Sequence, residues 1–545
     1  MDREAPRSAA GADHPGARIE AFLRGLAGRN LSRFLVFSAV ALVVSLFLQF
    51  QSPGIPDPDS FYHFRHAALY AEKGLWMKDF PWLAYSIINR YSADIGYGFH
   101  FLLIPFTLLG NDVFGLKLAA ALACAVVLIL VYWVMRRHRV AFDFAWPFLL
   151  LFLAPPMVFT FLMTRPQTLT MGSLALLLSF LVLGSPWAVL LASFAISFVH
   201  LNVFPVIPAV VFVVGLTQLV TERRWEWRKW LAALGGIGLG WLLRPNPIGV
   251  AKLEYVQIVV HELVRHQRTP LMFGQEWTPV SPAALSAFLY FLLFWITTAV
   301  VFVIAASLRR TGASPRDRTL LWSSLLLSAV FFAATVLVTK RITPLWATCA
   351  VIFCARAFTC LLDPLDKRPD RFLKEEARLL IAFSLAAVFA LMVWDGVNQH
   401  VLQRRWPGIP PRRLQAAADW LGRNSRPGDV VFNVDWGLFP ELFFWGPQNR
   451  YVSGLDPIFL YAYDQSLYWQ SHHLAADDTG AYTCGVMVCA PEKREDTYTV
   501  LKRDFRASHI VLSPSRSPAL DSYLRRDPRF ALGFRDAGVA VYRLE

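Results

Sequence analysis

Long runs of apolar residues, separated by short polar stretches, fill the first 399 residues of the chain. A helix needs about 20 mostly apolar residues to cross the hydrocarbon layer of a membrane. About eleven runs approach this length, and we predict membrane-spanning helices at 33–49, 113–135, 142–162, 168–183, 186–200, 202–220, 229–243, 281–307, 319–339, 342–362 and 379–398. The run Phe99–Leu109 is too short to cross alone, so we expect it at the outer interface.

From about residue 400 the pattern changes to short segments of two kinds. Leu414–Leu421 is typical of a helix, whereas three later segments are typical of strands: Asp429–Asn433, His509–Ser513 and Ala540–Leu544. Alternating helices and strands indicate a small α/β domain. The predicted fold class is an α-helical multi-pass membrane protein of about eleven spans with a C-terminal extracytoplasmic α/β domain.

The composition agrees with this fold class. Of the 545 residues 55% are hydrophobic, which is too apolar for an ordinary soluble enzyme. The 19 tryptophans suit membrane interfaces and pockets for apolar ligands. The net charge of +14 does not indicate nucleic acid, because the basic residues lie in short loops between apolar runs and form no continuous patch.

Those basic loops predict how the chain is oriented. They lie at 136–139, 223–229, 309–318 and 367–371, and further arginines lie before the first span. Loops rich in Lys and Arg stay in the cytoplasm. We therefore predict a cytoplasmic segment 1–32, a membrane domain 33–399 in an inner membrane, and a periplasmic domain 400–545. The large loops 50–112 and 244–280 fall on the periplasmic side. The first span lacks the small-residue cleavage site of a signal peptide.

The six cysteines add one expectation. Four lie in apolar runs, where cysteine packs as a small hydrophobic residue. Cys484 and Cys489 lie five residues apart in the tail and could close a disulfide loop in an extracytoplasmic domain. The sequence contains no CxxC pair or zinc-ligand spacing.

The predicted topology gathers a set of polar residues on the outer side. They include Asp57, Asp59, His63, Arg65, Asp94, His100, His261, Glu262, His266, Glu276, Arg341 and Asp435. Oxygen ligands on paired loops suit Mn²⁺ or Mg²⁺, which would neutralise a phosphate leaving group. Guanidinium groups match phosphate oxygens, so Arg65 and Arg341 are candidate phosphate ligands. A carboxylate facing them could accept a proton from an attacking nucleophile.

Each of these residues also has a structural interpretation. Asp59 or Ser60 could cap a helix over Phe61–Tyr70, and Asp435 could cap a turn. Glu276 could be an interfacial loop acid, and Arg341 could reach from a span end to the interface. The run from His261 to His266 is not a zinc-protease HExxH motif, because its histidines are five residues apart.

Four stretches, in order along the chain, resemble the catalytic subunit of oligosaccharyltransferases, which are GT-C membrane glycosyltransferases. Asp59-Ser60-Phe61-Tyr62-His63-Phe64-Arg65 is similar to the family's first outer-loop motif, and Glu276-Trp277-Thr278-Pro279 to its later loop acid. Arg341 is similar in position to the arginine that binds the donor phosphate. Asn433-Val434-Asp435-Trp436-Gly437 resembles the motif of the soluble domain, and Asn449-Arg450-Tyr451 and Asp456 follow it as in the family.

The resemblance implies roles for these residues. Asp59 and Asp57 would bind Mn²⁺ or Mg²⁺ and activate the acceptor, with Asp94 or His100 completing the metal site. The donor would be bound by Arg341, Arg65 and His63. Glu276 would contact the acceptor or the metal. The acceptor site would be shaped by three residues of the tail domain, Asp435, Trp436 and Gly437.

Two departures from the family pattern stand out. The family's second acidic motif should supply an Asp, but the matching region, Met163–Thr168, contains no acid. Either Asp57, Asp94 or His100 completes the metal site, or a metal is not needed as it is in the family. The two tryptophans with which the family recognises an asparagine acceptor are here Asn433 and Val434.

The sequence therefore predicts a glycosyltransferase that moves a sugar or oligosaccharide from a polyprenyl-phosphate-linked donor to a protein or glycan acceptor at the outer face of the lipid bilayer. One alternative is a monosaccharide transferase that uses a polyprenyl-monophosphate sugar, as protein mannosyltransferases and aminoarabinose transferases do. The other is a non-catalytic transporter or envelope assembly protein. A transporter should carry ionisable residues in mid-membrane, whereas these spans are nearly free of acids.

Overall fold

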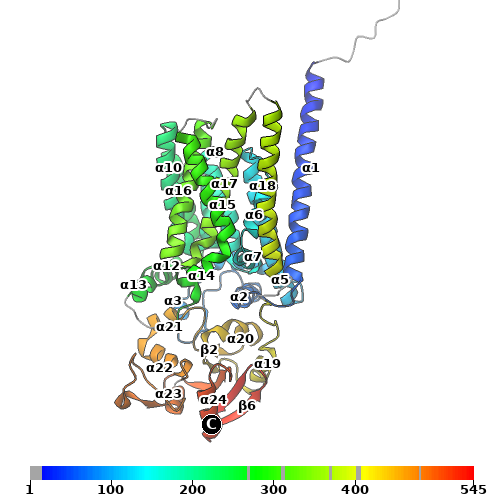
Figure 1. Cartoon of the computed structure of the whole chain (residues 1–545). Helices are drawn as coiled ribbons and strands as arrows, with labels where there is room; N and C mark the ends of the chain where they lie inside the picture. Colours follow the sequence, from blue (N-terminus) through cyan, green and yellow to red (C-terminus); the bar gives the residue numbers. More distant parts are fainter. Residues whose placement is uncertain (1–14, 267–270, 308–312, 367–370, 400–406, 478–479) are drawn as a thin grey trace, which may run out of the picture.

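The computed structural model consists of a layer of long helices, a band of short helices below it and an α/β domain at the far end (Figure 1). It describes residues 15–266, 271–307, 313–366, 371–399, 407–477 and 480–545. The basic residues Arg309, Arg310, Lys367 and Arg368 of the predicted cytoplasmic loops lie outside the described residues, as do residues 1–14 of the predicted segment 1–32.

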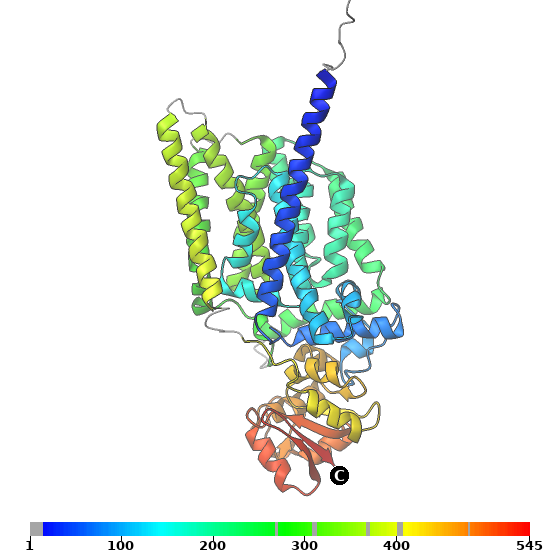
Figure 2. The same cartoon turned by 90° about the vertical axis from the view of Figure 1, so that its right-hand side faces the viewer.

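The long helices stand side by side, with α1 on the outside of the layer (Figure 2). Their bounds are α1 (Pro15–Phe50), α5 (Asp112–Arg137), α6 (Ala145–Phe152), α7 (Pro155–Leu162), α8 (Pro166–Leu183), α9 (Pro186–Val199), α10 (Val206–Glu222), α11 (Trp227–Leu242), α15 (Leu289–Ser307), α16 (Pro315–Leu337), α17 (Thr343–Asp366) and α18 (Arg371–Val397). The largest cluster of buried apolar residues lies among them.

Seven helical segments of the described chain are long and apolar enough to cross a membrane, or eight if one bent pair counts as a span. The predicted count of about eleven is therefore not confirmed. The predicted span 142–162 is that bent pair, α6 and α7, which meet at 97°. Two prolines, Pro155 and Pro156, begin α7, and proline cannot continue a helix from the preceding turn. The predicted spans 186–200 and 229–243 are the helices α9 and α11, of 14 and 16 residues.

The short helices below this layer come from the two predicted outer loops. Loop 50–112 forms α2 (Asp59–Lys73), α3 (Ile87–Tyr91) and α4 (Tyr97–Thr107), and α4 contains most of the apolar run 99–109. Loop 244–280 forms α12 (Pro247–Tyr255), the π-helical turn η2 (Val256–Val260), α13 (His261–His266) and the 3₁₀ turn η3 (Gln275–Trp277). Two further short elements, α14 (Pro282–Leu285) and η4 (Ser286–Phe288), lead into α15.

The C-terminal domain is built on a five-stranded sheet of order β2-β1-β5-β7-β6. Strands β2 (Arg450–Tyr451), β1 (Val430–Asn433) and β5 (Ala507–Leu512) are parallel, and β7 (Ala540–Leu544) and β6 (Phe530–Arg535) continue the sheet in antiparallel fashion. The helices are α19 (Gln415–Asn424), α20 (Phe439–Trp445), α21 (Pro457–Tyr463), α22 (Gln465–Ala475), α23 (Thr497–Arg503) and α24 (Pro518–Arg526). A small hairpin pairs β3 (Tyr482–Thr483) with β4 (Glu495–Asp496).

These observations confirm the α/β character of the tail. The predicted helix and all three predicted strands are present, at α19, β1, β5 and β7. The disulfide between Cys484 and Cys489 is also present, with their Cα atoms 5.6 Å apart. Strands β2 and β6 were not predicted, because β2 has two residues and the glycine at 533 interrupts the apolar pattern of β6.

The C-terminal domain is hydrogen-bonded to loop 50–112. The Tyr451 amide donates to the carbonyl of Trp82 at 2.7 Å, and the Ala84 amide donates to the carbonyl of Tyr451 at 2.8 Å. A second pairing joins Ile55 to Ile409. The domain thus shares backbone pairing with the segment that carries the first acidic motif.

Candidate active site

The first acidic motif lies at the start of α2. Asp57 precedes the helix, and its Oδ1 accepts a hydrogen bond from the Ser60 hydroxyl at 2.5 Å. That hydroxyl in turn accepts from the Thr164 amide at 3.0 Å. Neither Asp59 nor Ser60 caps the helix with its side chain, so the structural interpretation of this motif as a cap is wrong. Instead the motif ties the start of α2 to the segment before α8.

Arg165, in that segment, contacts three carboxylates. Its Nε lies 2.5 Å from Asp57 Oδ2, its Nη2 lies 2.7 Å from Asp59 Oδ2, and its Nη1 lies 2.9 Å from Glu276 Oε2. These acids come from two loops, and Asp59 and Glu276 are more than 200 residues apart in the sequence. The guanidinium therefore joins the two outer loops at the end of a membrane helix.

Arg341 belongs to the same group of charged residues, which we call the charged cluster. Its other members are Asp57, Asp59, Arg165 and Glu276. Arg341 lies in the 3₁₀ turn η5 (Lys340–Ile342) between α16 and α17, and its side chain forms an ion pair with Glu276. Its guanidinium carbon lies 3.7 Å from the ring centre of Trp277, a cation–π contact. Arg341 thus does not simply reach toward the interface, and Glu276 is not an isolated loop acid.

A cavity of about 100 Å³ opens beside the charged cluster. Residues from both loops, the membrane helices and the C-terminal domain line it, including Asp59, His63, Arg165, Gln167, Gln257, Arg341 and Asp456. Within the described residues, the Nε of Arg341 and the Oε1 atoms of Gln167 and Gln257 are buried without a hydrogen-bond partner. Buried polar groups normally have partners, so these atoms are suited to bind a polar ligand.

The cavity holds two carboxyl groups whose pKa is raised. Burial raises the pKa of Asp59 to about 6; Arg165 opposes the shift, whereas Asp57 and Glu276 add to it. Burial also raises the pKa of Asp456 to about 6, although the Ile458 amide and Arg341 stabilise its charged form. Burial disfavours the charged form of Glu276, but its two arginine partners outweigh burial and lower its pKa to about 2.

A carboxyl group with the pKa of Asp59 can exchange a proton with a bound ligand near neutral pH. A base works best when its pKa lies near the operating pH. Only Oδ2 of Asp59 has an ion-pair partner among the described residues, and about one fifth of the side chain is exposed. Its other oxygen is free to accept a proton in the cavity.

Three side chains, Asp94, His100 and His63, form a chain of hydrogen bonds that ends at the cavity. His100 Nδ1 lies 2.7 Å from Asp94 Oδ2, and His100 Nε2 lies 2.8 Å from His63 Nδ1. Burial holds the pKa of His63 well below its ordinary value. When both imidazoles are neutral, Asp94 accepts from His100 and His100 accepts from His63, which leaves Nε2 of His63 as an acceptor. His63 lines the cavity.

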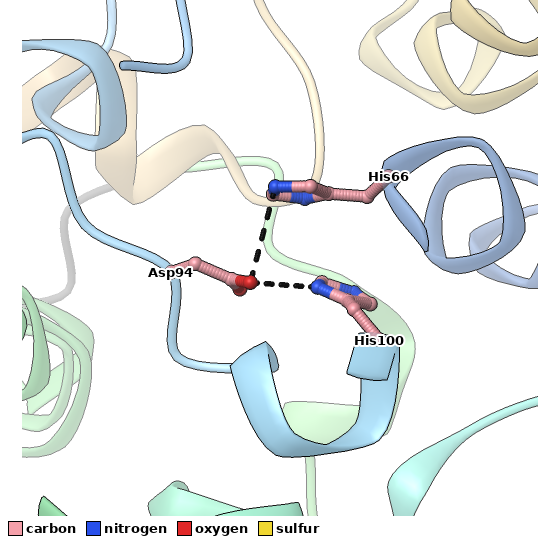
Figure 3. Close-up of side chains that lie close together, drawn as sticks. All are labelled: His66, Asp94 and His100. Atoms are coloured by element: carbon pink, nitrogen blue, oxygen red, sulfur yellow. Dashed lines mark hydrogen bonds and ion pairs between the residues drawn. The ribbon is translucent and has the colours of Figure 1, made fainter. Parts of the chain in front are cut away.

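His66 joins Asp94 and His100 to form a group of possible metal ligands, whose ligand atoms lie within 4.8 Å of one another (Figure 3). Two imidazoles and one carboxylate suit a transition metal better than Mg²⁺. Both oxygens of Asp94 already accept hydrogen bonds, from Tyr70, His100 and the Gly96 amide. The rings of His66 and His100 are stacked with their centres 4.3 Å apart. The three residues fit a closed hydrogen-bonded cluster better than a site for Mn²⁺ or Mg²⁺.

Asp57 and Asp59 do not fit a divalent ion any better than the cluster of His66, Asp94 and His100 does. Arg165 lies within hydrogen-bond distance of both carboxylates, and its charge would repel a cation placed between them. The structure thus separates the four predicted metal ligands into two groups, Asp57 with Asp59 and Asp94 with His100.

The structure keeps some of the other predicted residues away from the cavity. Arg65 pairs with Glu72 on its own helix at 3.0 Å. Asp435 caps the turn η7 (Trp436–Leu438) by accepting from the Gly437 amide at 2.7 Å, and it also pairs with Arg516. Trp436 lines a separate small cavity with Met272. The cap interpretation of Asp435 is therefore confirmed.

Two residues of the cavity, Arg165 and Asp456, were not predicted as site residues. Arg165 stands in the segment where an acid was expected, and a buried arginine that ends beside three acids has no local signature in the sequence. Asp456 caps α21 and accepts from the Trp277 indole at 2.8 Å. The available signal was that Asp456 follows the motif of the soluble domain in the same order as in the family.

Comparison with known proteins identifies the fold. No protein-family model matches the sequence, and no curated protein is similar to it in sequence. Among solved structures, the apo oligosaccharyltransferase of Archaeoglobus fulgidus is similar over 88% of this chain and 69% of its own, with 11% identity and a TM-score of 0.60. Apo ArnT from Cupriavidus metallidurans is similar over 94% of this chain and 98% of its own, with 14% identity and a TM-score of 0.54.

A second ArnT structure, bound to undecaprenyl phosphate, is similar over 93% of this chain and 97% of its own. The identity is 16% and the TM-score 0.53. The oligosaccharyltransferase and ArnT are both GT-C glycosyltransferases. This protein therefore has the GT-C fold of membrane glycosyltransferases, with membrane helices and a C-terminal α/β domain, as the sequence predicted.

Proposed function

We propose that the protein transfers a sugar from a polyprenyl-phosphate-linked donor to an acceptor at the outer face of the membrane. The observation that carries the proposal is the cavity in which Asp59, Arg165 and Arg341 meet at the end of the membrane helices. Two guanidinium groups beside a carboxylate of raised pKa suit the release of a phosphate and the removal of one proton. The ArnT structure with bound undecaprenyl phosphate supports a lipid carrier.

In the proposed reaction, a hydroxyl or amine of the acceptor attacks the anomeric carbon of the sugar. The acceptor's proton moves to the free oxygen of Asp59. The bond between the anomeric carbon and the phosphate oxygen breaks, and the polyprenyl phosphate leaves with the electron pair. Arg341 stabilises that phosphate, because its buried Nε has no partner among the described residues and can donate to it.

The size of the protein favours one of the two donor types. The chain and ArnT cover each other almost completely, whereas the chain covers 69% of the oligosaccharyltransferase. The carrier bound in the ArnT structure, undecaprenyl phosphate, bears a single phosphate. We therefore favour a polyprenyl-monophosphate sugar over a lipid-linked oligosaccharide.

A transfer assay tests this function. Purified protein is incubated with a bacterial lipid extract, and release of free polyprenyl phosphate is followed by mass spectrometry for the wild type and for Asp59→Asn. Asp419→Asn, an exposed carboxylate of α19, serves as the matched control. We expect release with the wild type and the control, and loss with Asp59→Asn. Equal release from Asp59→Asn would refute the assignment, and consumption of a diphosphate-linked lipid would favour the other donor type.

A further inference from the structure

Arg165 lies among the three carboxylates of the charged cluster. In a metal-dependent site, a divalent ion would occupy this position. All three side-chain nitrogens of Arg165 are engaged, each with a different carboxylate, at 2.5, 2.7 and 2.9 Å. The Arg165 side chain is 11% exposed, so solvent screens these pairs little. Three converging carboxylates are the usual ligands of a hard divalent cation, and here they converge on a guanidinium.

The backbone holds Arg165 in this position. Pro166 begins α8 directly after it, and proline fixes its own φ in the first turn of a helix. The Thr164 amide donates to the Ser60 hydroxyl at 3.0 Å, and the Thr164 hydroxyl donates to the carbonyl of Leu116 at 3.3 Å. The segment before Arg165 is therefore hydrogen-bonded to α2 and α5. These contacts fix the backbone of Arg165 at a point from which its guanidinium reaches the three acids.

We propose that Arg165 is the resident cation of this site and takes the place of a divalent metal ion. Its fixed charge holds Asp59 in position, balances Asp57 and Glu276, and joins Arg341 in presenting positive charge to a phosphate. A divalent ion cannot occupy the same carboxylates while Arg165 remains. The proposal rests on the same cavity as the proposed function, but it makes a claim about charge that can be measured without turnover.

Removing Arg165 should turn the cluster into a metal site. In Arg165→Ala the three acids lose their shared partner and face each other across the space that the guanidinium occupied. Unpaired carboxylates in a partly buried site bind a cation strongly, because no other charge compensates them. Arg341 still pairs with Glu276, so Asp57 and Asp59 would supply most of the affinity.

The test is Mn²⁺ binding to chelator-stripped protein in detergent, measured by electron paramagnetic resonance of free Mn²⁺. The variants are Arg165→Ala, Arg165→Ala with Asp59→Asn, Asp59→Asn alone, and Arg503→Ala as control. Arg503 also bridges two carboxylates, Glu495 and Asp504, but on the exposed surface of the C-terminal domain. Removing it leaves two acids in water, where they bind a single ion weakly.

We expect Arg165→Ala to gain one Mn²⁺ site that the added Asp59→Asn removes, while the wild type and Arg503→Ala gain none. A site in the wild type that Asp59→Asn abolishes would overturn the proposal, as would a folded Arg165→Ala that binds no Mn²⁺. If Arg165→Ala fails to fold, the wild type compared with Asp59→Asn still decides the question.

The transfer assay in excess chelator separates this inference from the proposed function. Undiminished release by the wild type supports Arg165 as the resident cation, whereas release that requires added Mn²⁺ overturns it. If no condition gives release, the proposed function fails, and the binding experiment alone decides the role of Arg165.

Discussion

In the proposed reaction, Asp59 accepts the proton of the acceptor and Arg341 stabilises the leaving phosphate. Asp59 faces the cavity with one free oxygen, and Arg341 offers a buried nitrogen without a partner in the described chain. Arg165 lies between the acids and keeps their charges from repelling one another. The raised pKa of Asp59 predicts how the transfer rate depends on pH. The planar guanidinium of Arg341 predicts how its substitution changes donor binding.

The rate of transfer should fall as the pH drops through about 6. Burial raises the pKa of Asp59 to about 6, and only the deprotonated carboxylate can accept the acceptor's proton. The rate should therefore be full above this pH and lost below it, as measured by release of polyprenyl phosphate across the pH range. Asp456 has a pKa of about 6 as well, so Asp456→Asn is the control. Persistence of the same midpoint in Asp456→Asn assigns it to Asp59, and disappearance of the midpoint would assign it to Asp456.

Replacing Arg341 by lysine should weaken donor binding. Lysine keeps the charge but loses the planar fork and its stacking on Trp277. Loss of a hydrogen bond to a charged group costs about 1.5–3 kcal/mol, which corresponds to a rise of roughly 10- to 100-fold in the donor KM. Steady-state kinetics should show this rise, whereas Arg503→Lys should leave KM unchanged. An unchanged KM in Arg341→Lys would exclude Arg341 as the phosphate ligand.

Among the helices and strands, the segment around η3 links the membrane domain to the C-terminal domain. The Trp277 indole donates to Asp456 at 2.8 Å, its ring lies 4.0 Å from the ring centre of His261, and Arg341 stacks on it. The same segment places Glu276 beside Arg165. Movement of η3 would therefore disturb both arginines at once.

Trp277→Phe tests this link. Phenylalanine keeps an aromatic face for Arg341 but leaves the buried Asp456 without its indole donor, which should cost about 1–3 kcal/mol of stability. We expect a lower melting temperature and a higher donor KM. Trp445→Phe is the matched control, because among the described residues its indole donates to the carbonyl of Pro411, within the C-terminal domain. A drop in stability with an unchanged KM would show that η3 does not position the site.

The sequence predicted the helices and strands better than it predicted the contacts between them. Apolar runs located every long helix, since hydrophobicity along the chain is a local property. They did not predict that α6 and α7 form a bent pair, because the apolar pattern continues through the break between them. The motif at Asp59 was found from the sequence, but Arg165 was not, since its three partners are 106 to 111 residues away.

The two domains together enclose the site. The C-terminal domain pairs its backbone with loop 50–112 at Trp82 and Ile55, and it contributes Asp456 to the cavity. The N-terminal helix α1 begins at the face of the helical layer opposite this domain (Figure 1). The proposed orientation puts the domain and the cavity outside the cell and the basic loop at 223–229 inside.

Cysteine labelling can check that orientation. The free cysteines among the described residues are buried, so single cysteines introduced by Asp419→Cys and Arg223→Cys should react above a low background. An impermeant maleimide added to intact spheroplasts should label Asp419→Cys, and Arg223→Cys should react only after permeabilisation. The reverse pattern would place the cavity on the cytoplasmic side and refute transfer at the outer face.

The most direct measurement is an electron cryomicroscopy structure of the protein in lipid nanodiscs with bound undecaprenyl phosphate. The proposed function predicts phosphate density in the cavity within hydrogen-bond distance of Arg341, with Asp59 facing the position that the sugar would occupy. Arg165 should still contact Asp57 and Asp59. Phosphate bound elsewhere, with this cavity closed and its polar groups paired among themselves, would contradict the proposed function.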